Sequence, residues 1–225
     1  MSITFGAGIT LGAGIAITPS VVSLPNLRFD TNYIGNSVGT TFGDTLLFAG
    51  GPGSSVCLTT EQMSSTGKYM VTWAMDLNID PVQGIGVANR SVNLNNFLGY
   101  DTNGIGFFQD GTLWNNNTQV GSGLPTWGAY DVVDLAVDNA GYSMWIRVNN
   151  GDWNNSPTAN PQTNTEGVEV FPGQYIAACI QAYSGPSEWN ICLQPVGSHV
   201  PSGFTFWGPG PTFTIDVGDF ATAQA

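Results

Sequence analysis

The residues suited to acid–base chemistry are few and poorly spaced for it. Glycoside hydrolysis needs two carboxylates, one on each side of the bond that breaks, and Glu166 with Glu169 is the closest pair of glutamates. No aspartate lies between them and a Thr/Asn-rich stretch precedes them, which is typical of a solvated strand edge. The single histidine, His199, precedes Val-Pro-Ser-Gly, away from any Ser/Asp constellation. The sequence therefore predicts no catalytic residue and no enzyme.

One aspartate pair imitates a metal site. Asp76-Leu-Asn-Ile-Asp80 resembles the start of a calcium loop. An EF-hand needs Gly at position six and a bidentate Glu at position twelve, whereas this chain has Pro81 and Val87 there. A looser calcium site among loop carboxylates stays open, beside the simpler interpretation of a strand end and a pre-proline turn. We predict no metal and no cofactor.

The three cysteines, Cys57, Cys179 and Cys192, are too few for a disulfide scaffold, and their odd number leaves at least one thiol free. Cys179 and Cys192 fall on consecutive predicted strands, which as a hairpin would make them neighbours. The alternative is two small buried thiols in a reducing compartment. The sequence leaves this pairing open.

Aromatic residues are the more informative candidates for binding. Five of the seven tryptophans lie in or beside loops rich in Asn, Gly and Thr: Trp114, Trp127, Trp153, Trp189 and Trp207. An exposed indole next to amide side chains stacks on sugar rings or anchors a protein interface. We take the first four, with Asn116, as candidate ligand- or partner-binding residues. The competing interpretation is that each ring packs under its own loop.

Composition limits the fold and the partners. The 225 residues include 4 Lys and Arg against 16 Asp and Glu, a formal net charge of −12. Four scattered cations cannot neutralise a row of phosphates, which excludes nucleic acid and disfavours an anionic membrane. Hydrophobic residues make up 42% of the chain, too many for a disordered acidic tail. The scarcity of Lys and Glu argues against a mainly helical protein.

The N-terminus repeats a hexad, ITFGAG, ITLGAG and IAITPS over residues 3 to 20. Its apolar residues recur two apart, the period of an extended strand: Ile3, Phe5, Ile9, Leu11, Ile15 and Ile17. No cation precedes this run, and it is shorter than the ~20 residues that span a bilayer. We expect residues 1–25 to attach the protein to a neighbouring chain or to assemble with copies of themselves. The alternative is a glycine-rich strand folded against the main domain.

From residue 26 onward, short alternating runs are separated by turn signals such as Asp110-Gly111 and Asn149-Asn150-Gly151. Many short strands without a helical period indicate a β-sandwich. The residues between 154 and 165 form an Asn/Thr/Pro-rich loop. Six strands are expected most clearly, over residues 69–75, 84–88, 132–137, 142–148, 175–182 and 189–193.

Several of these segments resemble, in order, the motifs of SPRY domains. One departure is that Ala129-Tyr130 stands where the family has Gly before Asp131. The resemblance implies an all-β, bent antiparallel SPRY-like sandwich over residues 26–207, generally non-enzymatic, which binds through loops at one end. Residues 208–225 would be a C-terminal strand or tail. The matching segments are GKYMVTW (67–73), GIGVA (84–88), LGY (98–100), DGTLWN (110–115), DVVDLAVD (131–138), SMWI (143–146) with the NNG turn (149–151), and VPSGF (200–204).

The N-terminal hexads are similar to the openings of structural proteins from tailed phages, particularly cyanophages, and VPSGF resembles the end of SPRY-like modules in phage proteins. The resemblance implies a non-enzymatic virion structural protein, as a capsid decoration, head fibre or tail-fibre component. It would be assembled in the host cytoplasm and exposed on the virion exterior, with other virion proteins and its own copies as partners. The alternative function is a lectin-like adhesin or receptor-binding module for host surface glycan.

Overall fold

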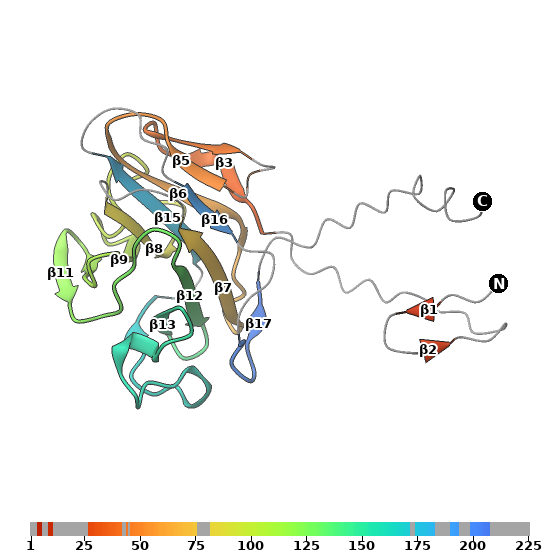
Figure 1. The fold of residues 1–225 in the computed structure, drawn as a ribbon. Coiled ribbons are helices and arrows are strands. Elements are labelled where there is room, and N and C mark those ends of the chain that lie inside the picture. The colour runs from red at the N-terminus through yellow and green to blue at the C-terminus, as the bar shows by residue number, and fades with distance from the viewer. Residues whose placement is uncertain are drawn as a thin grey trace, which may run out of the picture.

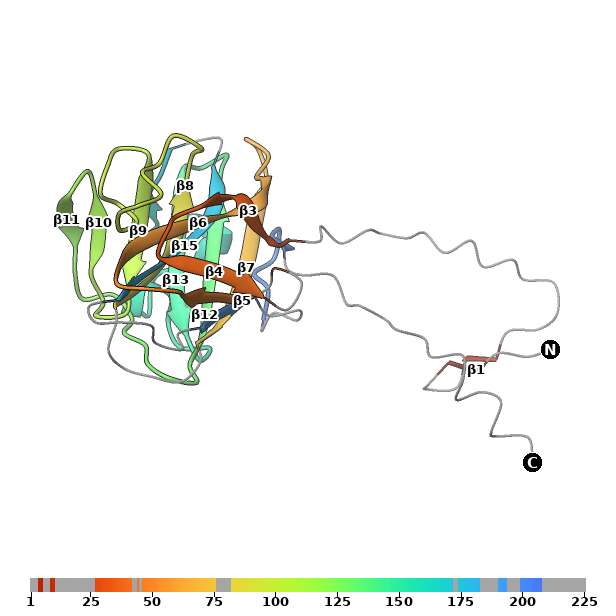
Figure 2. The same ribbon diagram turned by 90° about the horizontal axis from the view of Figure 1, so that it is seen from above.

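The computed structural model describes residues 4–5, 9–10, 27–41, 44, 46–75, 82–171, 174–182, 190–193 and 199–207. Almost all regular structure within them is β-strand, in two large sheets (Figures 1 and 2). Two 3-10 turns, η1 (Trp153–Asn155) and η2 (Pro161–Thr163), lie in the predicted long loop. No helix in this part of the chain is long and apolar enough to cross a membrane. The predicted all-β fold is confirmed.

The first sheet has seven antiparallel strands in the order β11-β10-β9-β8-β15-β6-β3. Its hairpins use the turns that the sequence marks. Asn116 and Asn117, both with positive φ, form the two-residue turn between β10 and β11. The strand bounds are β3 Phe29–Ile34, β6 Gly53–Gln62, β8 Val82–Ala88, β9 Gly104–Phe108, β10 Leu113–Asn115, β11 Thr118–Gly121 and β15 Tyr175–Ala182.

The second sheet has the order β14-β13-β12-β7-β16-β5-β4, and β17 pairs with β7 in parallel, off this path. The strand bounds are β4 Val38–Thr41, β5 Leu46–Ala49, β7 Lys68–Met75, β12 Val132–Asp138, β13 Ser143–Val148, β14 Val168–Glu169, β16 Asn190–Leu193 and β17 Thr205–Phe206. All six strands that the alternating runs predict are present, within two residues at each end. Strand β17, which follows the VPSGF motif, is not among these six.

The core lies between the two sheets and is built from alternate residues of each strand. In β7, Val71, Trp73 and Met75 point inward and are at most 2% exposed. In β12 the inward residues are Val133, Leu135 and Val137. This period of two is the pattern that predicts a strand with one face in the core.

The outer face of the first sheet is covered by the chain between β8 and β9, residues 89–103. Leu98 is fully buried there, in a cluster with Val92 and Phe108. Glycines make the close approach possible: a Cβ on Gly106 would lie 2.9 Å from the Leu98 carbonyl oxygen, and one on Gly104 would lie 2.9 Å from Leu98 Cδ1. The glycines of the GIG segments thus provide space for a loop to lie on the sheet.

The outer face of the second sheet is covered by residues 149–167 and 199–207, over a buried polar network. Asp134, 1% exposed, accepts hydrogen bonds from Thr72 Oγ1 (2.7 Å) and Arg147 Nε (2.8 Å). Arg147 also donates to the carbonyl oxygen of His199 (2.8 Å), and its guanidinium carbon lies 4.3 Å from the centre of the Trp153 ring. Arg147, paired with Asp134, therefore contacts both covering segments, residues 149–167 through Trp153 and residues 199–207 through His199.

The sparse cations of the sequence have structural partners. Besides Arg147, Lys68 pairs with Asp138 (2.7 Å). Arg90 lies 3.6 Å from Asp30 and stacks over two tyrosine rings. Three of the chain's four cations are therefore engaged within the sandwich.

The hexad segment contributes a short hairpin. Strands β1 (Thr4–Phe5) and β2 (Ile9–Thr10) pair antiparallel, with Phe5 opposite Ile9. The extended conformation predicted for these residues is confirmed at those positions. The other predicted assembly residues, Ile3, Leu11, Ile15 and Ile17, lie outside the described residues, as does the segment 208–225.

The expected hairpin of Cys179 and Cys192 is wrong. Cys179 lies in β15 of the first sheet, between β6 and β8, whereas Cys192 lies in β16 of the second sheet, between β5 and β7. The chain crosses between sheets after β15, so consecutive strands are not partners. Cys179 and Cys57 are buried free thiols.

Candidate functional site

Loops from both sheets meet where β9, β11 and β13 end. We call this set the loop end; it comprises residues 109–112, 122–131 and 149–155. The backbone carbonyl oxygen of Gln109 accepts a hydrogen bond from the backbone N–H of Trp127 (3.1 Å). Asn155 Nδ2 donates to the carbonyl oxygen of Gly123 (3.3 Å). The three loops are therefore tied to one another.

Asp131 is the junction of two of these loops. Its Oδ2 accepts from the backbone N–H of Gly128 (2.8 Å), and its Oδ1 accepts from Asn149 Nδ2 (2.6 Å). Asn149 in turn accepts from the backbone N–H of Val132 (2.9 Å) and has a φ of 50°. Asparagine suits this position because it tolerates the left-handed region and bonds the backbone locally.

Tyr130 precedes this junction in an unusual backbone position. Met75 accepts a hydrogen bond from the Tyr130 N–H (2.9 Å) and donates its own N–H to the carbonyl oxygen of Asp131 (3.0 Å). Two residues therefore oppose Met75, which is a β-bulge. Tyr130 has a φ of 68°, the conformation that such bulges give to glycine.

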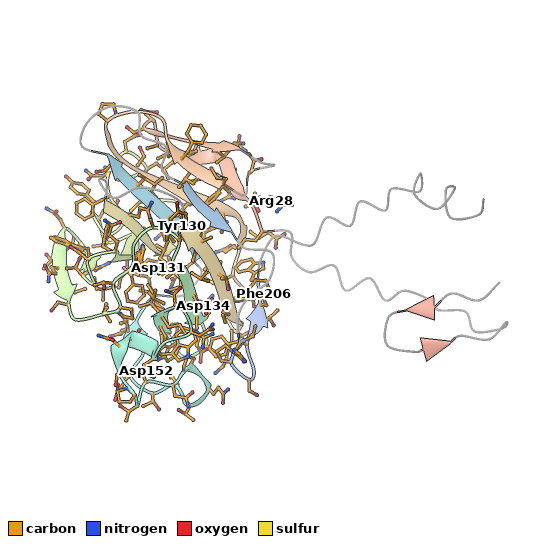
Figure 3. The ribbon with its side chains drawn as sticks, in the orientation of Figure 1. Arg28, Tyr130, Asp131, Asp134, Asp152 and Phe206 are labelled. Atoms are coloured by element: carbon orange, nitrogen blue, oxygen red, sulfur yellow. The ribbon has the colours of Figure 1, made fainter. Side chains whose placement is uncertain are left out.

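The ring of Tyr130 gains no burial from this arrangement. Tyr130 is 68% exposed, the highest value among the large apolar residues of the described part of the chain that are exposed. A left-handed conformation costs a non-glycine residue about 1–2 kcal/mol. A strained, exposed aromatic residue on a loop is a candidate functional residue. Figure 3 shows Tyr130 and Asp131 where the chain enters β12.

A polar pocket of about 420 Å³ opens between the same loops. Its lining includes Asp110, Thr126, Asp152 and Asn155, with Leu124 as an apolar wall. Asp110 Oδ1 already accepts two hydrogen bonds from Thr112, one from Oγ1 (2.6 Å) and one from the backbone N–H (3.0 Å). Such a surface offers oxygen acceptors and an amide to a ligand that carries hydroxyl or amine groups.

The predicted aromatic candidates do not form one surface. Trp114 packs against Phe97 on the outer face of the first sheet, with 5.6 Å between ring centres. Trp127 is 7% exposed and belongs to the core between the sheets, so it is not available to a ligand. Trp153 is half-buried beneath Arg147. Trp127 is therefore buried in the core, whereas Trp114 and Trp153 are partly buried on opposite outer faces of the sandwich.

The remaining candidates have simpler positions. Asn116 lies in the exposed turn between β10 and β11, and Trp189 lies outside the described residues. Trp207, 2% exposed, packs 4.7 Å from Tyr69, measured between ring centres. Of the two carboxylates, Glu169 lies on the edge strand β14, and hydrogen bonds from Ser156 and Thr158 lower the pKa of exposed Glu166.

Tyr130 is not among the candidate binding residues that the sequence predicts, which are tryptophans and Asn116. The sequence does carry a signal for it, because Ala129-Tyr130 replaces the glycine that the SPRY motif has before Asp131. The bulge explains that glycine, since it is the residue that adopts a positive φ without strain. The departure from the motif thus identifies the residue.

The buried thiols and the acidic residues offer little chemistry. Burial raises the pKa of Cys57 far above its usual range and that of Cys179 to about 12, so both thiols are protonated at neutral pH and are poor nucleophiles. Within the described residues, no group of three or more His, Cys, Asp or Glu side chains is placed to hold a metal ion. Asp76 and Asp80, the residues of the imitation calcium loop, lie outside that part.

Comparison with known proteins identifies the fold. No family model matches the sequence, and no curated protein matches it. The SPRY domain of human HERC1 is similar with a TM-score of 0.56 and 14% identity, over 75% of this chain and 99% of that domain. A second human SPRY domain has a TM-score of 0.52 and 11% identity, over 73% and 98%. Stonustoxin has a TM-score of 0.52 and 11% identity, over 75% of this chain and 27% of that one. These likenesses show a SPRY-like fold.

Proposed function

From this SPRY-like fold we propose that the chain is a non-enzymatic structural protein of a tailed-phage virion. Its sandwich is a binding module on the outside of the particle, as a capsid decoration, head fibre or tail-fibre component. Residues 1–25 attach it to other virion proteins and to its own copies. It is assembled in the host cytoplasm, and it does not bind nucleic acid or insert in a membrane.

The observation that carries the binding role is Tyr130. A glycine in its place would relieve the strain of a φ of 68°, and the ring is 68% exposed, so packing does not explain the tyrosine. An exposed tyrosine supplies a large contact area with a polar tip at a low cost in side-chain entropy. The loop end is thus the surface with which the sandwich contacts its target.

The role of residues 1–25 in attachment is supported by the cover that other segments give to the two outer faces of the sandwich. Both outer faces are covered, one by residues 89–103 and the other by residues 149–167 and 199–207. The chain before Arg28 has no charged side chain and repeats its apolar residues at strand spacing. The hexads therefore offer apolar surface that the core of the sandwich does not need.

The place on a particle is supported by the resemblance of the hexads and of VPSGF to phage proteins, and by the charge. With three of the four cations paired with aspartates, the sandwich presents mainly unpaired carboxylates. Copies with a uniform negative sign repel one another weakly in solution, which keeps them soluble until the segment brings them together. The sparse positive charge also agrees with a surface that has no affinity for nucleic acid.

Deletion of residues 2–20 from the protein in an infected host tests the attachment. The amount of protein in purified particles is measured against the major capsid component by mass spectrometry. We expect the deleted protein to be soluble and folded but absent from the particles. Incorporation at the wild-type level contradicts the proposal.

A second candidate, a lectin-like module for host glycan, is favoured by the pocket of Asp110, Asp152 and Asn155. Carboxylates and amides that converge on a pocket of about 420 Å³ suit the hydroxyl groups of a sugar. A glycan array compares the intact multimer with Asp152→Ala and Tyr130→Ala, and with Val200→Ala as a control on another exposed segment. Absence of binding by the folded multimer counts against this function.

A further inference from the structure

An apolar groove lies at one margin of the sandwich, between the edges of the two sheets. It encloses about 440 Å³. Buried core residues form its floor, and three partly buried or exposed apolar residues form its walls. The floor is Ile105, Leu113 and Val170, each at most 7% exposed, and the walls are Val120, Val168 and Phe171. Core side chains therefore line an opening to solvent.

Both rims of this groove are edge strands. Strand β11 pairs with β10 alone, and β14 pairs with β13 alone, among the described residues. An edge strand leaves half of its backbone N–H and C=O groups without a ladder partner. Val120 in β11 is 54% exposed and Glu169 is the only charged residue of the lining. The groove is a template for an extended, apolar, uncharged strand.

The chain carries a segment of that description. Residues 1–27 contain no charged side chain, and their hexads alternate apolar residues with small ones. Here the segment pairs with itself, through two strands of two residues each. An isolated two-stranded hairpin is marginally stable in water, so this pairing gives way readily to a wider one.

The chain's own segment starts from the far side of the sandwich. The chain enters the sandwich at β3, the opposite edge of the same seven-stranded sheet (Figure 2). Six strand spacings of about 4.8 Å put β11 about 29 Å away in a straight line. Residues 12–28, which link Leu11 to β3, span about 60 Å when fully extended, so chain length alone does not decide between the two segments. The assembly role proposed for residues 1–25 favours the segment of a neighbouring copy.

We propose that the hexad segment of one copy lies in the groove between β11 and β14 of a second copy, as an added strand. The inference rests on the assembly role proposed above for residues 1–25 and names the surface that receives them. Donor and acceptor are different surfaces, so the contact is head-to-tail. Such contacts close into rings or continue as filaments, which suits a protein repeated on a particle.

Two full-length variants separate the donor from the acceptor. The donor variant carries Ile9→Asp and Leu11→Asp, and the acceptor variant carries Val120→Asp. Val200→Asp is the matched control, an exposed valine (37%) far from the groove in sequence. Native mass spectrometry and light scattering measure the mass of each protein, and circular dichroism verifies the fold. We expect the wild type and the control to form oligomers, and each of the two variants alone to be monomeric.

Mixing the two variants is the decisive step. The acceptor variant retains its segment and the donor variant retains its groove, so the mixture forms one-to-one dimers and nothing larger. If the acceptor variant oligomerises like the wild type while the donor variant is monomeric, the segments assemble with one another; the groove proposal is then wrong and the assembly role stands. If the donor variant oligomerises, both the groove and the assembly role of the hexads are contradicted. If the wild type is monomeric at every concentration tested, the groove and the self-assembly of the segment are contradicted, whereas its attachment to other virion proteins is decided by the deletion of residues 2–20.

Discussion

The buried ion pair of Arg147 and Asp134 gives the sharpest prediction about stability. Their side chains are 9% and 1% exposed and 2.8 Å apart. Arg147→Met keeps an unbranched apolar stem but leaves a carboxylate in the interior without its cation. Breaking one partner of a buried pair costs about 3–5 kcal/mol. For a chain of this size each kcal/mol lowers Tm by about 2–4 °C, so we expect a loss of about 6–20 °C.

Urea unfolding and thermal scans of four variants measure this cost: Arg147→Met, Asp134→Leu, the double variant and a control. Arg28→Met is the matched control, since no ion pair joins Arg28 within the described residues, and it should change stability by less than about 1 kcal/mol. The double variant Arg147→Met with Asp134→Leu should recover most of the loss, because no buried charge remains. Hydrogen exchange should rise in residues 149–167 and 199–207 of the single variant.

A cost under about 1 kcal/mol for Arg147→Met, the value of a surface pair, would show that the pair is not energetically buried. A double variant that loses the sum of the two single effects would show that the two groups do not interact, because independent groups are additive.

Three further predictions concern single residues. Gly106→Ala should lower the free energy of unfolding by about 1–3 kcal/mol in urea, because the new Cβ forces Leu98 off the sheet. Gly51→Ala, where nothing lies within 4 Å of the new Cβ, should be nearly neutral. Equal effects of the two variants contradict the close packing of Leu98 on Gly106. Tyr130→Gly should raise stability by about 1 kcal/mol while it lowers the retention of the multimer on host cells, and a loss of stability removes the argument from strain. Burial raises the pKa of Cys179 to about 12, so on raising the pH the thiol ionises in the unfolded chain before it ionises in the folded one. The free energy of unfolding is therefore unaffected by this thiol below about pH 9. From there to about pH 12 it falls by about 1.4 kcal/mol per pH unit. Cys179→Ala should flatten the fall of stability over that range, and an unchanged slope contradicts the assignment.

The strands of this fold can be predicted from the sequence because their signals are local. Alternation of apolar residues gives β7 and β12, and the Asn-Asn-Gly turn after Val148 ends β13 where expected. The order of motifs then indicates the SPRY-like arrangement. No sequence pattern of this kind shows which strands share a sheet. Cys179 and Cys192 illustrate this, since the partners of each strand come from distant parts of the chain.

The candidate site is predicted only in part. Trp127 lies in a loop of the sequence but its side chain belongs to the core. Its position in a loop does not predict this, because its burial depends on core residues from distant strands, such as Leu113 and Leu135. Tyr130 has a signal, the missing glycine, but its meaning needs the bulge opposite Met75. No sequence pattern predicts the groove between β11 and β14, since the groove depends on how the edges of two sheets meet.

Electron microscopy of the purified particle is the most direct test of a place on the virion exterior. We expect copies of the sandwich on the outer surface, with Tyr130 and the loop end facing solvent and residues 1–25 held between the copies or against the particle. Particles that carry no sandwich outside, or that bury the loop end against the shell and leave the N-terminal segment free, contradict the proposed function.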